Sequence, residues 1–225
     1  MKGFINLFKP EGMSSAYAAG AVKWKLKIPC GHMGTLDPMA SGILPVGVGK
    51  TSRLFDYILD KKKTYRAKFR FGFSTDTLDV TGKTENTTTF IPSEEKIRSV
   101  LSSFTGEIMQ KPPRFSAKSV CGKLGSLCTM SALCRTASGI FDIKNSVGVE
   151  ELKNSDEPEK YLIKPELALS FSEIVLTERE ATRILNGIFD YKTEKDGLYK
   201  VFCEEEFWGV GESTNGILRI KAYVR

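Results

Sequence analysis

One aspartate in a glycine-rich stretch is the clearest candidate for chemistry in this sequence. Residues 31–42 read GHMGTLDPMASG and contain both Asp37 and His32, which is the single histidine of the chain. Pro38 fixes its own φ angle and favours an extended Asp37, and the glycines permit backbone angles that larger residues avoid. The pattern predicts a rigid loop that presents one carboxylate, although Asp-Pro and glycine are also common in ordinary structural turns.

A carboxylate presented in this way can attack an electrophilic carbon, stabilise a developing cation or remove a proton. The sequence does not choose among these roles, so Asp37 is predicted to be a nucleophile or a general base. No metal centre is expected, because the chain has one histidine and five cysteines without a CxxC pair. The odd number of cysteines predicts reduced thiols rather than a disulfide framework.

A second glycine-rich stretch, residues 47–51 with the sequence GVGKT, raises the alternative of a nucleotide-binding protein. The phosphate-binding loop has the pattern GxxxxGK[ST], whose glycines let the backbone surround the phosphates. Leu44 stands where the first of these glycines is required, and Pro45 follows it. The pattern therefore disfavours this alternative.

The charge of the chain favours a polyanionic partner. Its 225 residues allow one large domain or two smaller ones, and its net charge is +6. The denser of its cationic groups lies in one short segment, which contains Lys61, Lys62, Lys63, Arg66, Lys68 and Arg70. Such a segment can be a solvated face, but it also fits binding to nucleic acid. No apolar run is long enough to span a bilayer or to act as a signal peptide, so a cytoplasmic protein is expected.

Short regular elements are expected on both sides of the Asp37 loop. Residues 3–8 and 43–48 read as strands, and a helix that ends near residue 26 begins at Ser14 or Ser15. Residues 64–71 alternate between cations and aromatic or small side chains, which predicts a half-buried antiparallel strand with a basic outer face.

Near the C-terminus, Thr177 and Glu180 have the spacing of a capping box, which predicts the start of a helix. Short strands separated by turn residues are expected after it.

The Asp37 loop continues through Leu44 and Pro45 and resembles the catalytic loop of the TruB-type tRNA pseudouridine synthases, whose pattern is close to GHxGTLDPxAxGxLP. Five further stretches resemble blocks of the same family: residues 9–15 (KPEGMSS), 63–65 (KTY), 75–82 (TDTLDVTG), 112–117 (PPRFSA) and 133–141 (LCRTASGIF). Several blocks in the right order are a specific signal, whereas a single short motif is not.

The resemblance implies an activity and a set of site residues. Enzymes of this family break the C1′–N1 bond of a tRNA uridine, turn the base and rejoin it through C5 without a cofactor. The implied target is uridine 55 of the T loop, which must be flipped out of the folded RNA. Asp37 is the implied catalytic residue. The expected substrate-binding residues are Tyr65, which would stack on the base, together with His32, Lys9, Thr35 and Leu36.

The resemblance also implies an α+β architecture with a mixed, mainly antiparallel sheet. Residues 1–153 would form the pseudouridine synthase catalytic domain, residues 154–164 a linker, and residues 165–225 a small β-rich PUA-like domain that binds RNA. The expected partner is the T stem-loop of tRNA, bound by a monomer without a metal or a membrane.

The chain departs from the family pattern in one respect. The family carries a TYIR segment between the PPxFSA and LxRTxSGxF blocks, and its arginine pairs with the catalytic aspartate. No TYIR-like segment occurs here, which indicates that an internal segment near residues 123/124 is missing. Arg135, Arg114 and Arg53 are available, but nothing in the sequence places them beside Asp37. The alternative function is a non-catalytic RNA-binding protein on the same scaffold.

Overall fold

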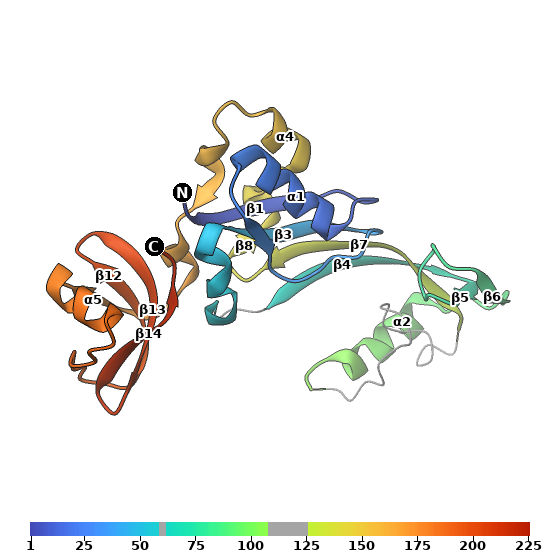
Figure 1. Cartoon of the computed structure of the whole chain (residues 1–225). Coiled ribbons are helices and arrows are strands. Elements are labelled where there is room, and N and C mark those ends of the chain that lie inside the picture. Colours follow the sequence, from blue (N-terminus) through green and yellow to red (C-terminus); the bar gives the residue numbers. More distant parts are fainter. Residues whose placement is uncertain (59–61, 108–125) are drawn as a thin grey trace. The chain divides into compact units, whose positions relative to one another are not determined.

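The computed structural model describes residues 1–58, 62–107 and 126–225 of the chain (Figure 1). They form two compact units, of which the first contains Met1–Thr64 and Arg135–Arg225 and the second contains Tyr65–Cys134. Two strands, β4 (Lys63–Phe71) and β7 (Cys128–Ser138), run from one unit into the other.

The main sheet is built on a long, buried antiparallel pair, β1 (Gly3–Lys9) and β3 (Ala40–Val48). Neighbouring strands follow the order β10-β1-β3-β7-β4, where β10 is Leu162–Ile163. β9 (Val147–Gly148) runs parallel to β1, whereas β3 and β10 run antiparallel to it. The predicted α+β class with a mixed, mainly antiparallel sheet is therefore confirmed.

Helices α1 (Ser15–Leu26) and α4 (Val149–Asn154) pack together against these strands (Figure 1). Ser14 is the N-cap of α1, because its hydroxyl accepts the backbone N–H of Tyr17 at 3.2 Å. The buried side of α1 includes Ala18, Ala19 and Ala21, whose small side chains allow a close approach to the sheet. Ser15, which the sequence left as the other possible cap, instead points into the protein interior, where it is 3% exposed.

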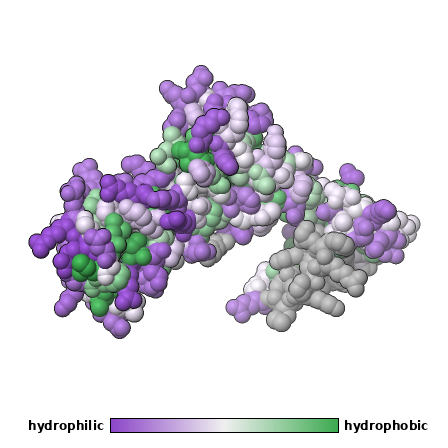
Figure 2. Space-filling model, viewed as in Figure 1, coloured by the Kyte–Doolittle hydropathy of each residue, from purple (hydrophilic) through white to green (hydrophobic). Residues whose placement is uncertain are grey.

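The C-terminal elements form a second sheet in the first unit. Its order is β11 (Ser172–Leu176), β12 (Gly197–Cys203), β13 (Glu206–Thr214) and β14 (Ile217–Tyr223). Helix α5 (Glu178–Leu185) packs on this sheet. Figure 2 shows hydrophobic surface over these elements, where the exposed apolar side chains are Val175, Leu185, Ile188 and Phe189.

The predicted capping box at the start of α5 is confirmed. The Thr177 hydroxyl accepts the N–H of Glu180 at 3.4 Å, and the Glu180 carboxylate accepts the N–H of Thr177 at 2.8 Å. The bonds that the Glu180 carboxylate accepts from the N–H and the hydroxyl of Thr177 hold the pKa of this carboxyl below its usual value.

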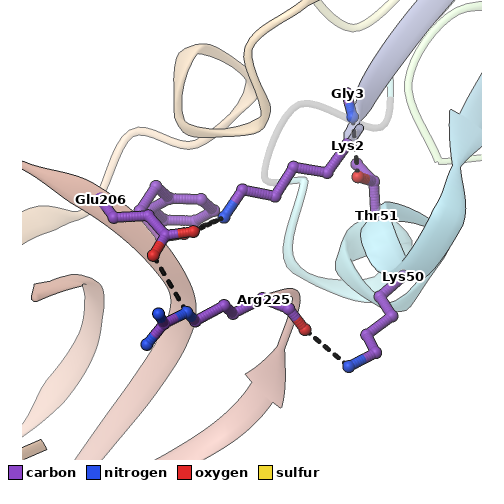
Figure 3. Close-up of polar contacts among 7 residues, drawn as sticks. Lys2, Gly3, Lys50, Thr51, Glu206 and Arg225 are labelled. Atoms are coloured by element: carbon purple, nitrogen blue, oxygen red, sulfur yellow. Dashed lines mark hydrogen bonds and ion pairs between the residues drawn. The ribbon is translucent and has the colours of Figure 1, made fainter.

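One hydrophobic core joins the two sheets of the first unit. Phe4 and Leu54 belong to the same buried cluster as Val210 and Val224. Polar contacts also join the two sheets. The Lys2 ammonium donates to the Phe207 carbonyl at 2.7 Å and to the Glu206 carboxylate at 3.0 Å (Figure 3).

The segment predicted as a linker, residues 154–164, contains regular structure. Pro158–Tyr161 form a 3-10 helix, and Ile163 in β10 lies opposite Phe4 in the main sheet. The predicted division into a catalytic and a PUA-like domain stays a prediction.

In the second unit, β4 is followed by β5 (Phe73–Thr75), β6 (Thr84–Thr87) and α2 (Glu94–Leu101). The residues of β4 from Lys63 to Arg70 are all exposed, so the prediction of a half-buried strand is wrong. β4 is exposed because it lies at the end of the sheet order, where it has a neighbouring strand on one side. The nearby helix α2 buries none of its own residues, so it does not form a packed layer in this unit. Alternation shows which side chains share a face, but not whether anything packs on that face.

Cys128 is disulfide-bonded, whereas Cys30, Cys134 and Cys203 are free thiols. The expectation of reduced thiols throughout is therefore wrong at Cys128, because an odd number of cysteines does not exclude one bridge.

No helix in the described parts of the chain is long and apolar enough to cross a membrane.

Candidate active site

The Asp37 loop connects β2 (Cys30–His32) to β3, which run antiparallel to each other. The Met33 N–H donates to the Pro45 carbonyl at 2.8 Å and closes the base of the loop. At its tip, the Ala40 N–H donates to the Asp37 carbonyl at 3.0 Å. The chain therefore reverses at Asp37 and Pro38, as the Asp-Pro pair predicts.

Ser15 holds the residue that precedes Asp37. Its hydroxyl donates to the Leu36 carbonyl and accepts the Leu36 N–H, each at 2.8 Å. Both residues are 3% exposed, so the two bonds are shielded from water. Because both backbone groups of Leu36 are engaged by one side chain, the direction in which the chain enters Asp37 is fixed.

Lys9 holds the residue that follows Asp37. Its side chain is 0% exposed, and its ammonium donates to the carbonyls of Met13 at 2.6 Å, Pro10 at 3.0 Å and Pro38 at 3.4 Å. The Pro38 carbonyl also accepts the Gly12 N–H at 2.8 Å. The turn between β1 and α1 is thereby tied to the tip of the loop.

Burial lowers the pKa of the Lys9 ammonium, although the negative charges of the Asp37 and Glu11 carboxylates oppose this shift. The three carbonyl acceptors compensate a buried cation that would otherwise be costly.

Arg135 of β7 holds the loop from a third side. Its guanidinium donates from Nη2 to the Thr35 carbonyl at 2.7 Å and from Nη1 to the Ile43 carbonyl at 3.4 Å. The side chain is 2% exposed. Gly42 lets the strands approach closely, because a Cβ at this position would lie 2.2 Å from the Arg135 carbonyl oxygen.

The Asp37 carboxylate itself is exposed, and it makes no hydrogen bond or ion pair with any residue that the structure describes. Two cations from other strands lie beside Gly34 of the loop. A Cβ placed on Gly34 would be 3.7 Å from both the Lys63 ammonium nitrogen and Arg135 Nη1. The result is a fixed backbone that carries an unengaged carboxylate in positive surroundings, which suits attack on, or stabilisation of, a cationic carbon.

The family model described as "TruB family pseudouridylate synthase (N terminal domain)" matches residues 23–131. The chain is also 33% identical to tRNA pseudouridine synthase B of Clostridium kluyveri, over 94% of this chain and 95% of that protein. The chain belongs to the TruB family of pseudouridine synthases. The predicted membership of an enzyme family of isomerases is thereby confirmed.

A second TruB relative also matches nearly the whole chain. The protein of the same name from Aquifex aeolicus is 29% identical over 98% of this chain and 99% of that protein. The alignment with the Clostridium kluyveri protein spans 276 positions, whereas this chain has 225 residues. Its relatives therefore contain residues that have no counterpart here, and the position of the gap near residues 123/124 stays a prediction.

Solved structures support the fold. A crystal structure of an archaeal box H/ACA sRNP Nop10-Cbf5 complex is similar over 99% of this chain and 86% of that chain, with a TM-score of 0.68 and 20% identity. A Cbf5-Nop10-Gar1 complex gives a TM-score of 0.72 with 21% identity, over 99% of this chain and 85% of that chain.

The other residues expected at the TruB site are distributed as follows. His32 lies at the end of β2, and its buried Nδ1 has no hydrogen-bond partner in the described structure. Tyr65 is 45% exposed and belongs to the second unit. Lys9, Thr35 and Leu36 make the loop contacts given above, so in this structure they position Asp37. Substrate contact by these five residues stays a prediction.

Of the arginines available from the sequence, the structure describes Arg53 and Arg135, and Arg135 reaches the Asp37 loop. Arg53 donates to the Tyr223 carbonyl at 3.3 Å, and Arg114 lies outside the described residues. The role of Ser15 was missed, because a serine beside a helix start usually indicates a cap.

The nucleotide-binding alternative finds no support at residues 47–51. The Thr51 hydroxyl accepts the Gly3 N–H at 3.0 Å, and the Lys50 ammonium donates to the Arg225 carbonyl at 2.6 Å (Figure 3). Both side chains that a phosphate loop would use are therefore engaged within the protein.

Proposed function

We propose that this chain isomerises uridine to pseudouridine in tRNA, with uridine 55 of the T loop as its target and Asp37 as the catalytic carboxylate. The observation that carries the proposal is the convergence of Ser15, Lys9 and Arg135 on the backbone of residues 35–38. Three buried side chains from three elements fix this backbone, yet the Asp37 carboxylate is left exposed. Such preorganisation is typical of a catalytic group.

The reaction needs no outside reagent. The C1′–N1 bond of the uridine breaks, the base turns, and a C1′–C5 bond forms while the proton of C5 is lost and N1 gains one. Asp37 acts either by attacking C1′ as a nucleophile or by removing a proton as a base. Glycosidases use carboxylates for the same task of managing positive character at C1′.

We propose tRNA as the substrate because several relatives are named tRNA pseudouridine synthase B. The target base must leave the RNA stack to reach Asp37. The exposed ring of Tyr65 is the proposed stacking partner, and His32 is the proposed contact to the neighbouring RNA. Residues 165–225 are assigned as the PUA-like domain, whose sheet provides further RNA contacts.

A non-catalytic RNA-binding protein is the second candidate. Two observations favour it: Asp37 has no ion-pair partner in the described structure, and the relatives contain residues that are missing here. In this case the chain would bind tRNA and leave its uridines unchanged.

The test is incubation of the purified chain with an unmodified tRNA transcript, followed by digestion and chromatography of the nucleosides. The proposal predicts about one pseudouridine per tRNA, and none when uridine 55 is replaced by cytidine. Pseudouridine formed equally in both transcripts would contradict the target. Bound tRNA without any pseudouridine would support the second candidate.

A further inference from the structure

Strand β4 combines three properties that no other strand of the described structure shares. It is exposed along Lys63–Arg70 on both faces, it lies at the end of the sheet order, and it is strongly basic. Arg66, Lys68 and Arg70 alternate with Ala67 and Phe69, so the three cations share one face of the strand.

The described residues provide no counterion for the charges of this face. Arg66, Lys68 and Arg70 form no ion pair or side-chain hydrogen bond in the described structure. Some other cations of the described structure are paired with carboxylates, as in the ion pair between Lys200 and Glu173 at 2.8 Å.

Two carboxylates of the second unit have partners other than these cations. Asp79 accepts bonds from Thr77 and Thr81, and Glu94 pairs with Arg98 at 2.6 Å. A row of like charges without counterions is unfavourable by itself, and it becomes favourable when a polyanion neutralises it.

The outer edge of β4 also carries backbone N–H groups, which can donate hydrogen bonds beside these cations. Among the described strands, β7 is the one neighbour of β4 in the sheet order, so the backbone N–H groups of its outer edge have no strand partner there. Backbone N–H groups and cationic side chains are the groups that contact phosphate oxygens in nucleic-acid complexes.

We propose that Arg66, Lys68 and Arg70 form a binding track for the RNA phosphate backbone. The RNA is the substrate of the proposed function, and this inference rests on that function. β4 begins at Lys63, whose ammonium lies beside Gly34 of the Asp37 loop. The track thus belongs to the strand that starts at the catalytic loop. It contributes affinity for the RNA, whereas the chemistry at the uridine does not depend on it.

A second protein chain is a less suitable occupant of the same edge. Pairing β4 with β4 of another copy would place rows of cations beside each other, which is destabilising. Charged residues on an edge strand, lysine in particular, are a common means of preventing such pairing.

The experiment measures RNA binding in an Asp37→Asn background, where no product forms. A fluorescently labelled T-arm stem-loop is titrated at several salt concentrations with this protein and with a variant that also carries R66Q, K68Q and R70Q. The matched control carries K144Q, K160Q and K164Q, which removes three exposed lysines of the first unit. Circular dichroism verifies that all three proteins are folded.

If the track binds RNA, the triple variant of β4 should bind the labelled stem-loop roughly tenfold more weakly. The slope of the logarithm of the association constant against the logarithm of the salt concentration should fall in magnitude by about 2. The control should keep the affinity within about threefold, because its lysines lie outside the track. Equal losses in the two variants, or an unchanged slope in the β4 variant, would overturn the proposal. If the β4 variant fails to fold, K68E alone provides the same comparison. Since binding is measured without turnover, the outcome does not depend on whether the chain makes pseudouridine.

Discussion

The hydroxyl of Ser15 forms two hydrogen bonds of 2.8 Å with Leu36, one to its carbonyl and one from its N–H. A single side chain thereby holds the peptide groups on both sides of the residue that precedes Asp37. With Lys9 at Pro38 and Arg135 at Thr35, it leaves the Asp37 loop little freedom. The proposed chemistry depends on this restraint, because a carboxylate displaced by about 1 Å can lose about 100-fold in rate.

Replacing Ser15 by alanine should therefore damage catalysis more than binding. The variant leaves two buried backbone groups of Leu36 without partners, which costs about 1–3 kcal/mol of stability. We expect kcat to fall by roughly 10- to 100-fold while the Kd for the T-arm RNA changes little. Single-turnover kinetics and RNA titration measure the two effects separately.

The neighbouring serine is the control. Ser14→Ala removes the N-cap of α1 and costs about 1 kcal/mol, but it leaves the contacts of Leu36 intact. Its kcat should stay within about threefold of that of the parent. Equal losses of kcat in the two variants would show that general destabilisation of α1, rather than the Leu36 contact, is responsible.

Arg135→Lys tests whether the geometry of the guanidinium matters or only its charge. Lysine keeps the positive charge but cannot donate to the Thr35 and Ile43 carbonyls in the same fork. We expect kcat to fall by about tenfold or more with a folded protein. Arg53→Lys is the matched control, since Arg53 is not bonded to the loop. Full activity of Arg135→Lys would show that charge alone suffices.

Two glycines give opposite predictions for stability. Gly42 has a φ of +114°, and a Cβ there would meet the backbone of Arg135 at 2.2 Å, so Gly42→Ala should destabilise the protein by about 2–4 kcal/mol. A Cβ on Gly20, within α1, would meet no atom within 4 Å, so Gly20→Ala should stabilise it by about 0.5–1 kcal/mol. Thermal unfolding of both variants checks the signs, and a stabilised Gly42→Ala would contradict the close approach of β3 and β7.

Cys30 should make stability depend on pH in the alkaline range. Burial raises the pKa of its thiol from 9.0 to about 11, against the opposing charge of Lys23. Between these values the unfolded chain loses the proton first, so the stabilising effect is complete below about pH 9 and is lost as the pH rises towards 11. Urea unfolding at pH 8.5 and 10.5 should show a smaller decrease for Cys30→Ser than for the parent. If the free energy of unfolding decreased equally in the two proteins, the thiol of Cys30 would be exposed to water rather than buried.

The turn that presents Asp37 could be predicted because it depends on residue types that are close in sequence. Asp37, Pro38 and the glycines define a turn whatever surrounds it. The contacts that fix the turn come from Lys9, Ser15 and Arg135, which are all far from the turn along the chain. Local patterns do not reveal which distant side chain reaches a given carbonyl, so Ser15 was predicted as a possible cap and Arg135 was left unplaced.

The exposure of β4 shows a second limit. The alternation over residues 64–71 correctly indicates a strand, but the sequence does not show whether a further element covers it. The monomeric state, the cytoplasmic location and the division near residues 154–164 stay predictions for a related reason, since they depend on surfaces and boundaries rather than on local residue patterns.

The most direct test of the central claim uses T-arm RNA that carries tritium at C5 of the target uridine. Formation of the C1′–C5 bond must release this tritium to water. The account predicts release by the parent protein and none by Asp37→Asn, although both bind the RNA with similar affinity. Equal release by Asp37→Asn would contradict the role of Asp37, and absence of release by the parent with the RNA bound would contradict the catalytic function itself.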